Sequence, residues 1–470
     1  MSGTTKPAPQ PGSSDAAASD LATIDRRLEQ RLGSSIAELE RLVAQPSVAA
    51  QNLGVEACAE LVSGMLRARG FAVEVLPTGG APVVVAERAG RTGNTLLIYN
   101  HYDVQPPEPL EAWISPPFEP ALRDGRLYGC GVSDDKGHIT SRLLAIDALL
   151  EQRGELPCRV KFVIEGEEEV GSVHLPEFLK RSRERLAADA CLWEFGSVDH
   201  RGVPMQYAGL RGICYVELSV ETAAIDVHSG VGGSIFPNAA WRLTWALASL
   251  KDRNERIRIS GHYDPVRPPT ARDRELMAAL PEIAGEYRER YGVKQFLCGL
   301  EGGVELLIAE VFEPTCTICG LTAGYQGPGS KTVLPARASA KVDFRLVPDQ
   351  TPEQVVRGLR AHLDAEGFPD VRITFLGGGP AGRTDPDHPF VRLVAETARP
   401  VYGAPMQVVP MTGGSGPNHA FIHELGVPVA TAGLGYPDTR AHAPNENVSL
   451  DLYLKHAKHV VRLLDAFAVT

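Results

Sequence analysis

The fold class follows from two stretches of the chain, TLLIYNHYD at residues 95–103 and RVKFVIEGEEE at residues 159–169. Each begins with a short apolar run of the kind that forms a buried strand, and each ends in side chains able to bind metals. Between them, ITSRLLAIDALLEQRG at residues 139–154 has the length and apolar spacing of a helix. This alternation predicts an α/β fold, with helices on both faces of a mixed, mostly parallel sheet.

Polar side chains gather where these two predicted strands end. His101 and Asp103 end the first strand, and residues 167–169 are three consecutive glutamates after the second. A glycine-rich turn between them, GCGVSDDKG at residues 129–137, carries two adjacent aspartates just before the helix. Open α/β sheets bind ligands beyond the carboxyl ends of their strands, so we expect these groups to lie along one edge of the sheet.

Each of these clusters has a structural explanation when it is taken alone. A run of glutamates is usually a solvated surface, an Asp-Asp pair before a helix is commonly an N-cap, and a His-x-Asp at a strand end is commonly a turn. Their joint occurrence favours a cation, because carboxylates crowded at one edge repel one another unless a positive charge lies between them.

The overall composition narrows the classes of function. With 470 residues, 43% of them hydrophobic and 22% charged, the chain is predicted to be a globular protein of two domains. A formal net charge of -11 without any basic run argues against nucleic acid as a partner. No stretch approaches the roughly 18 to 20 apolar residues that span a bilayer, so no association with a membrane is expected.

The cysteines and the N-terminus bear on the cellular compartment. Eight cysteines in so long a chain are too sparse for a disulfide framework. Cys316 and Cys319 form one close pair, but no second pair stands at zinc-finger spacing, and buried structural cysteines are favoured over a metal site. Reduced thiols, and an N-terminus without an apolar core behind a basic start, predict the cytoplasm.

The chain resembles the M20 (aminoacylase/carnosinase-like) family of metallopeptidases, and most closely its cytosolic nonspecific dipeptidase branch. The resemblance covers nearly the whole chain beyond the N-terminal tail. Ten motifs follow the order of the family: HYDVQP (101–106), GCGVSDDKG (129–137), EGEEEVGS (165–172), DACLWEFG (189–196), GLRG (209–212), DVHSG (226–230), GPGSKTVLP (327–335), FRLVPDQ (344–350), GGSGP (413–417) and AHAPNENV (441–448).

The resemblance implies a centre of two divalent metal ions per subunit. His101 and Glu194 would hold one ion, Glu169 and His442 would hold the other, and Asp134 would bridge both. Three protein ligands for each ion leave room for water and substrate, as a catalytic site requires. Zinc is expected, although carboxylate and imidazole ligands without thiolate also admit manganese or cobalt.

The residues next to these ligands are given roles by the same resemblance. Glu168 would act as general base, taking a proton from the attacking water and passing it to the leaving amine. Asp103 would accept the free ring N–H of His101, and Glu167 would be an exposed bystander. The peptide bond between Asp134 and the next residue would be cis.

The family likeness also implies the domain organisation, a zinc-exopeptidase-like fold with an inserted α+β lid and dimerisation domain. Residues 1–20, rich in Ser, Pro, Ala and Gly, are expected to be a disordered tail. The domain that carries the metals would comprise residues 21–211 and 379–470, and the lid residues 212–378. The protein is expected to be a homodimer.

Residues of the lid and of the last segment would contact the substrate. By resemblance, His228 would stabilise the developing oxyanion in the site of the partner subunit, although a lone histidine is more often structural. Glu446 would contact the substrate amine or support His442. Asn238, Thr332 and Arg345 would hold the carboxylate end of the substrate, and Ser415 and Gly416 would line the pocket.

The sequence therefore predicts a two-metal hydrolase that cleaves dipeptides. Position 194 leaves an alternative open, because carboxypeptidases and aminoacylases of the family usually have Glu there, and dipeptidases usually have Asp. The enzymatic alternative is an N-acyl-amino-acid deacylase or carboxypeptidase. A non-catalytic metal- or peptide-binding scaffold is the alternative of another class, and a candidate base beside five candidate ligands argues against it.

Overall fold

The computed structural model describes residues 12–470. These residues divide into two compact units. Of the described residues, unit 1 comprises 12–206, Asp387–Met406 and Val427–Thr470, and unit 2 comprises Tyr207–Pro386 and Gln407–Gly426.

Unit 1 is built on a six-stranded sheet in the order β1-β2-β6-β3-β7-β19. Its strands are β1 (Ala72–Leu76), β2 (Val83–Arg88), β6 (Arg159–Glu165), β3 (Thr95–His101), β7 (Ala190–Trp193) and β19 (Val429–Thr431). The first two pairings are antiparallel and the last three are parallel, which confirms the predicted mixed, mostly parallel sheet. Strand β3 is buried along its whole length, as its unbroken apolar run predicts.

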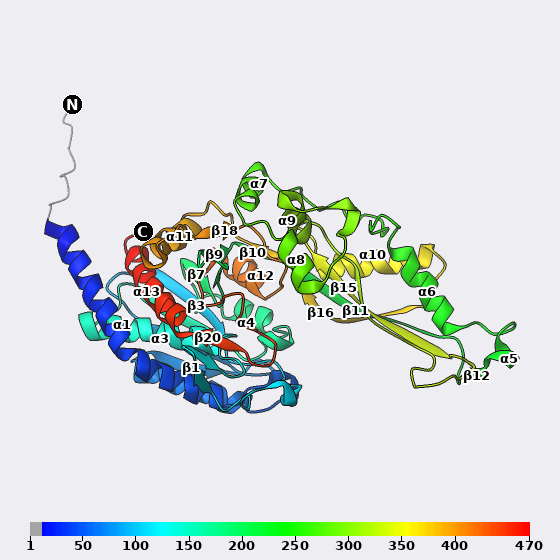
Figure 1. Ribbon diagram of the computed structural model, residues 1–470, viewed down its shortest axis with the longest axis horizontal. Coiled ribbons are helices and arrows are strands. Elements are labelled where there is room, and N and C mark those ends of the chain that lie inside the picture. The colour runs from blue at the N-terminus through cyan, green and yellow to red at the C-terminus, as the bar shows by residue number, and fades with distance from the viewer. Residues whose placement is uncertain (1–11) are drawn as a thin grey trace. The chain divides into compact units, whose positions relative to one another are not determined.

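Helices pack on this sheet and on one another. Helix α3 (Lys136–Arg153) contacts β3, and α1 (Gly12–Ala44) and α13 (Leu450–Phe467) pack against α3 (Figure 1). Helix α2 (Val55–Ala68) lies on β1 and β2, and α11 (Pro389–Tyr402) lies on β19 and α13. The other elements of this unit are α4 (Leu175–Arg181), a sheet of β4 (Ala121–Arg123), β5 (Arg126–Tyr128) and β20 (Asn447–Ser449), and the paired strands β8 (Ser197–Val198) and β9 (Pro204–Tyr207).

The start of α1 corrects one expectation. Residues 12–20 were expected to belong to a disordered tail, but α1 begins at Gly12, while residues 1–11 lie outside the described part of the chain. The alanine-rich run has a strong helix propensity, and the helix is tied down at Asp20, whose carboxylate lies 2.6 Å from Arg153 and accepts a hydrogen bond from Gln152. A low content of large apolar residues was therefore not a sufficient reason to expect disorder at residues 12–20.

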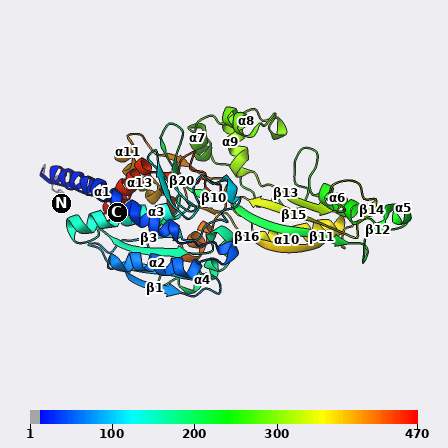
Figure 2. The same ribbon diagram turned by 60° about the horizontal axis from the view of Figure 1, so that its bottom comes forward.

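Unit 2 is an α+β structure built on a four-stranded antiparallel sheet in the order β13-β15-β11-β16. Its strands are β13 (Thr317–Ala323), β15 (Arg337–Leu346), β11 (Gly212–Glu221) and β16 (Arg372–Gly379). Side chains alternate along β11 between buried and partly exposed. The buried face packs against α6 (Ala239–Leu250) and α10 (Pro352–Ala365), which Figure 2 shows beside the sheet.

Short elements complete unit 2 and extend it beyond the predicted lid, residues 212–378. Strand β10 (Gly209–Leu210) pairs with β17 (Gly382–Arg383), so segments just outside the predicted lid join this unit. The remaining elements are β12 (Val227–His228), β14 (Val333–Leu334), β18 (Gln407–Val409), α5 (Ser229–Gly232), α7 (Ala271–Ala278), α8 (Ala284–Tyr291), α9 (Gly303–Phe312) and α12 (Asn418–Ala420). Among residues 12–470, no helix combines the length and the apolar character needed to cross a membrane.

Candidate metal centre

The predicted ligands of unit 1 come together at the carboxyl ends of its parallel strands. His101 is the last residue of β3 and pairs with Glu165 at the end of β6. Glu194 follows the last residue of β7, and the short helix Glu168–Val170 follows β6. Because β6, β3 and β7 are neighbouring parallel strands, their ends share one edge, as the sequence predicts.

Asp134 lies between two imidazoles. Its Oδ1 is 3.0 Å from Nε2 of His101, and its Oδ2 is 3.0 Å from Nε2 of His442. Nε2 of His442 is in turn 3.1 Å from a carboxylate oxygen of Glu169. Candidate ligand atoms of His101, Asp134 and Glu169 lie within 4.8 Å of one another, a spacing suited to cation binding.

Glu194 completes this group on the side of His101. Its Oε2 lies 3.9 Å from Nε2 of His101, too far for a hydrogen bond. This oxygen is buried and accepts no hydrogen bond from any residue between 12 and 470. A buried carboxylate oxygen without a donor is costly, and a cation between Glu194 and His101 would remove that cost. The donor set of imidazole nitrogen and carboxylate oxygen therefore fits divalent metals such as zinc, manganese or cobalt.

The electrostatics of the cluster point in the same direction. Burial disfavours the charge on Asp134, but hydrogen bonds from His101 and His442 outweigh it and hold the pKa of Asp134 well below its usual range. Hydrogen bonds to Asp134 and Glu169 raise the pKa of His442 to about 11. Burial lowers the pKa of His101, yet its bonds to Asp103 and Asp134 raise it well above the ordinary value. The directions of these shifts show that the cluster favours positive charge between its carboxylates.

Two glutamates of the cluster have raised pKa values. Burial raises the pKa of Glu168 well above its usual value, and the charges of Glu169 and Asp134 add to the effect. Burial likewise raises the pKa of Glu194, with the charge of Glu168 as the next cause. Both shifts reflect the crowding of carboxylates from which the sequence predicts a cation.

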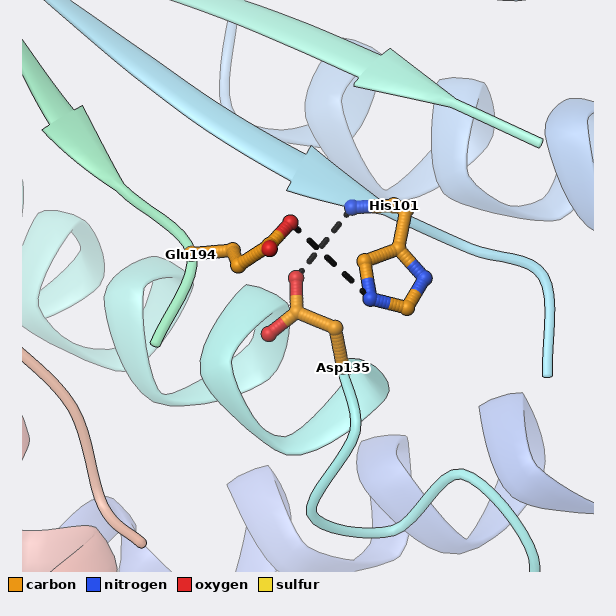
Figure 3. A group of neighbouring side chains, drawn as sticks. All are labelled: His101, Asp135 and Glu194. Atoms are coloured by element: carbon orange, nitrogen blue, oxygen red, sulfur yellow. Dashed lines mark hydrogen bonds and ion pairs between the residues drawn. The ribbon is translucent and has the colours of Figure 1, made fainter. Parts of the chain in front are cut away.

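Asp135 forms a second cluster, with His101 and Glu194, whose candidate ligand atoms also lie within 4.8 Å of one another (Figure 3). Oδ2 of Asp135 accepts hydrogen bonds from the backbone N–H of His101 at 3.2 Å and from Asn100 at 2.5 Å. Its Oδ1 is 2.7 Å from Nδ1 of His138. Oδ1 nevertheless accepts no hydrogen bond from any residue between 12 and 470, so Asp135 supports the edge of the sheet through Oδ2 alone. It stands at the N-cap position of α3 but makes no capping bond with its side chain.

Asp103 contacts His101 as the resemblance implies, and it also contacts the glutamate loop. Its Oδ1 lies 3.4 Å from Nδ1 of His101, and its backbone carbonyl lies 3.1 Å from the same nitrogen. Its two carboxylate oxygens accept the backbone N–H groups of Glu168 and Glu169 at 3.2 and 3.0 Å. The peptide bond between Asp134 and Asp135 is cis, as expected.

Glu446, expected to contact the substrate amine or to support His442, binds the turn that precedes α3. Its carboxylate accepts the backbone N–H groups of Gly131, Ser133 and Asp134 at 2.7, 2.8 and 2.9 Å. Glu446 therefore holds the turn that presents Asp134. These three hydrogen bonds all come from that turn and none comes from His442. Burial raises its pKa to about 8.

Several residues at this edge were missed or misjudged from sequence. Gln105 donates a hydrogen bond to Oε2 of Glu169 at 2.8 Å, and its place inside HYDVQP was the only available signal. Glu167 is not an exposed bystander, because its carboxylate lies 2.7 Å from Nδ1 of His174 and its side chain is 14% exposed. Arg142 was also missed, since nothing in its local sequence distinguishes it from other residues of α3.

The other predicted site residues lie in unit 2. His228 is exposed, and its Nδ1 accepts the N–H of Gly230. Asn238 is the N-cap of α6 and accepts the N–H groups of Ala240 and Trp241, so its side chain has a structural partner. Thr332 accepts the backbone N–H of Ser229 through its carbonyl.

Arg345 is the predicted lid residue that contacts another predicted site residue. Its Nη1 donates to Oγ of Ser415 at 2.9 Å, and its Nε donates to Asp343 at 3.1 Å. The structure thus brings Arg345 and Ser415 together within unit 2. Gly416, next in the chain, is partly exposed.

Comparison with known proteins places this geometry in context. Residues 97–466 match the sequence model of the Peptidase family M20/M25/M40. Beta-Ala-His dipeptidase of Rattus norvegicus is 31% identical over 339 residues, which cover 70% of this chain and 66% of that protein. Cys-Gly metallodipeptidase dug1 of Schizosaccharomyces pombe is 29% identical over 384 residues, which cover 78% of this chain and 80% of that protein.

Among solved structures, the M20 family metallo-carboxypeptidase Sso-CP2 from Sulfolobus solfataricus superposes with a TM-score of 0.89 and 35% identity. The match covers 93% of this chain and 99% of that chain. The alignments to the mammalian Beta-Ala-His dipeptidases are shorter, and span between 56% and 66% of their length.

Proposed function

Because the chain belongs to the peptidase family M20/M25/M40, we propose that this metallopeptidase is a two-metal hydrolase that cleaves the amide bond of dipeptides. One observation carries the proposal. Asp134 faces a histidine on each side at 3.0 Å, beside a buried oxygen of Glu194 that lacks a donor within residues 12–470. Relatives named as dipeptidases support the substrate class.

We propose that five side chains hold the two ions. His101 and Glu194 would bind one ion, Glu169 and His442 would bind the other, and Asp134 would bridge them. Zinc suits these ligands, and manganese or cobalt would fit the same atoms. Two divalent ions, when bound, lower the pKa of a shared water and polarise the scissile carbonyl.

Glu168 is the proposed general base. It lies beside Glu169 in the loop that Asp103 holds through two backbone N–H groups. From that place its carboxylate would take a proton from the attacking water and give it to the leaving amine. The loop sets its position relative to the ligand next to it in the chain.

The lid residues complete the proposal. Arg345, with Ser415 beside it, would bind the substrate carboxylate through its planar fork, helped by Asn238, Thr332 and Gly416. His228 would stabilise the oxyanion in the partner subunit of a homodimer, and its exposure leaves the ring accessible. The eight cysteines are all free, which supports a reducing compartment such as the cytoplasm.

A second candidate function has its own support. The metallo-carboxypeptidase Sso-CP2 is 35% identical to this chain, and glutamate at position 194 is the residue usual for carboxypeptidases and aminoacylases. A carboxypeptidase or N-acyl-amino-acid deacylase would use the same centre. Only the depth of the site beyond the scissile bond would differ, because longer or acylated substrates need more room there.

A substrate panel tests these alternatives. We expect the purified, metal-loaded protein to release amino acids from dipeptides, to lose that activity with a chelator, and to regain it with zinc, manganese or cobalt. Glu168→Gln should lower kcat by roughly 10²- to 10⁴-fold, the usual contribution of a general base. Glu167→Gln is the matched control in the same loop and should retain activity.

Each alternative outcome has a distinct meaning. Cleavage confined to longer peptides would assign a carboxypeptidase, and cleavage confined to N-acyl-amino acids would assign a deacylase. Metal binding without turnover of any substrate would identify a binding scaffold. Failure to bind metal would contradict all of these functions.

A further inference from the structure

Arg142 is a fully buried arginine near the proposed centre that has no assigned role. It lies on α3, and its guanidinium donates only to backbone carbonyls and one amide oxygen. Nη1 donates to the carbonyl of Tyr99 at 2.9 Å and to Oδ1 of Asn100 at 2.8 Å. Nη2 donates to the carbonyls of Trp193, Glu194 and Ala432.

These acceptors mark the carboxyl ends of three neighbouring strands. Tyr99 and Asn100 immediately precede His101 in β3. Trp193 ends β7, and Glu194 is itself a proposed ligand. Ala432 follows β19, which pairs with β7. One planar group thus joins the strand that ends in His101 to the strand that ends in Glu194.

The network continues to the helix start that presents Asp134. Asn100, which accepts from Arg142, donates to Oδ2 of Asp135 at 2.5 Å. The same oxygen accepts the backbone N–H of His101 at 3.2 Å (Figure 3). Hydrogen bonds therefore connect Arg142 to the residue before His101, through that residue to Asp135, and to the backbone of Glu194.

Arg142 is buried without a direct counter-ion. Arg142 makes no ion pair with a carboxylate in the part of the chain between residues 12 and 470, and its buried Nε lacks a partner there. Burying a charge without a direct counter-ion is costly, but an apolar residue at this position would leave the five buried acceptors without this donor. The value of the guanidinium lies in the five acceptors that it holds together.

We propose that Arg142 is a positioning residue that sets the separation of His101 and Glu194, and so tunes the affinity of one of the two metal ions. The inference rests on the proposed two-metal site. Groups behind metal ligands typically change metal affinity by roughly 10- to 100-fold when they are replaced. The planar fork matters as well as the charge, because a lysine ammonium cannot reach all five acceptors at once.

Metal titration of folded variants tests the proposal without relying on activity. Metal-free protein is titrated with Co²⁺, and binding is followed by equilibrium dialysis and visible absorption. For the wild type we expect two tight sites per chain. For Arg142→Met we expect one tight site and one weakened by about 10- to 100-fold. Arg142→Lys, which keeps the charge, should remain clearly weakened at the same site.

Two control variants separate positioning from general destabilisation. Glu194→Gln removes a proposed ligand and should reproduce the loss of the same site. Arg69→Met removes another largely buried arginine of unit 1, which is paired with Glu38 and Asp147. It should lower the melting temperature of the metal-free protein but leave both cobalt affinities unchanged.

The outcomes distinguish the two levels of inference. Two tight sites in Arg142→Met would overturn the role of Arg142 while leaving the proposed function intact, and so would full recovery in Arg142→Lys. A wild-type protein that binds no cobalt would overturn both. If Arg142→Met does not fold, Arg142→Lys decides the question. Lysine keeps the positive charge but loses the planar fork, so the proposal requires that only one of the two sites be weakened.

Discussion

At the scale of single residues, Asp103 connects two parts of the proposed centre. It is fully buried, and its carboxylate faces Nδ1 of His101 at 3.4 Å. The same carboxylate accepts two backbone N–H groups of the loop that carries Glu168 and Glu169. It therefore orients one imidazole and one loop together, which is what a group behind a metal ligand must do.

Replacing Asp103 with asparagine should loosen this arrangement. In Asp103→Asn one carboxylate oxygen becomes an NH₂ donor that faces a backbone N–H, so one bond to the loop is lost. We expect metal affinity to fall by about 10- to 100-fold and kcat to fall with it. Cobalt titration and steady-state kinetics measure the two effects.

A matched control for that substitution exists in the same unit. Asp199 also accepts two backbone N–H groups, those of Arg201 and Val203. Both bind Oδ1, while Oδ2 accepts from the guanidinium of Arg201, so the NH₂ group of Asp199→Asn would disrupt local hydrogen bonds to Oδ2 away from the proposed ligands. Equal losses of metal affinity in the two variants would show that loop stability, and not the contact with His101, is responsible.

At the scale of elements, the start of α3 is secured from two sides. Glu446 accepts three N–H groups of the turn 129–137, and Lys136 donates to the carbonyls of Leu42 and Gln45 at 3.0 and 2.7 Å, at the end of α1. Gly131 has a φ of 78° and lies so close to Val104 that a Cβ would meet its Cγ1 at 2.2 Å. The turn thus requires glycine for both conformation and space.

Helix α13 carries two buried histidines in contrasting environments. His456 is fully buried, and neither ring nitrogen has a hydrogen-bond partner within residues 12–470. His459 is also buried, but its Nε2 donates to the carbonyl of Val394 at 2.9 Å. An unpartnered buried polar group lowers stability, whereas a satisfied one does not.

The two histidines should therefore respond in opposite directions to the same substitution. We expect His456→Met to raise the free energy of unfolding by about 1 kcal/mol, because it removes two unsatisfied nitrogens at similar volume. We expect His459→Met to lower it by about 1 to 3 kcal/mol, because the carbonyl of Val394 loses its donor. Urea unfolding at neutral pH measures both, and a loss of stability in both variants would contradict the assignment.

At the scale of the whole molecule, buried histidines make stability depend on pH. Burial lowers the pKa of His262 in unit 2 and of His459 in unit 1 to about 4, from an ordinary value of 6.5. Below pH 6.5 the unfolded chain binds protons at these sites that the folded chain does not bind. Stability should therefore be fully present above pH 6.5 and be lost as pH falls towards 4, by up to about 3 kcal/mol for each group.

Removing one of these groups tests the sign. His459→Met is less stable at neutral pH but cannot take up that proton, so its unfolding free energy should change less between pH 6.5 and 4 than that of the wild type. Urea titrations at several pH values give the two slopes. Parallel slopes would mean that His459 does not contribute to the acid sensitivity.

Metal binding should also stabilise the fold. The proposed ligands all belong to unit 1, so we expect divalent metal to raise the melting transition of that unit and a chelator to lower it. An ion at 100 times its dissociation constant adds about 2.7 kcal/mol of stability. Calorimetry with and without zinc measures the shift, and Glu194→Gln should reduce it. An unchanged transition would argue against a site in the folded protein.

The predicted elements were recovered where local pattern determines structure. The apolar runs that became β3 and β6 and the periodic segment that became α3 lie where the sequence places them. The helical start at residues 12–20 was missed because the alanine-rich run favours a helix and Asp20 pairs with Arg153, which is distant in sequence. Side-chain periodicity cannot register such a contact.

The sequence by itself determined the α/β class, the family, and the side chains that meet at the edge of the sheet. The residues that end a strand can be identified from the local sequence, and the carboxyl ends of neighbouring parallel strands lie at the same edge. Only the tertiary structure decided what stands behind those side chains. Glu446 on the turn of Asp134, Asp135 beside Asn100, and Arg142 across three strands are pairings of distant segments. A buried polar group takes whichever partner the packed chain brings to it, and no local pattern encodes that choice.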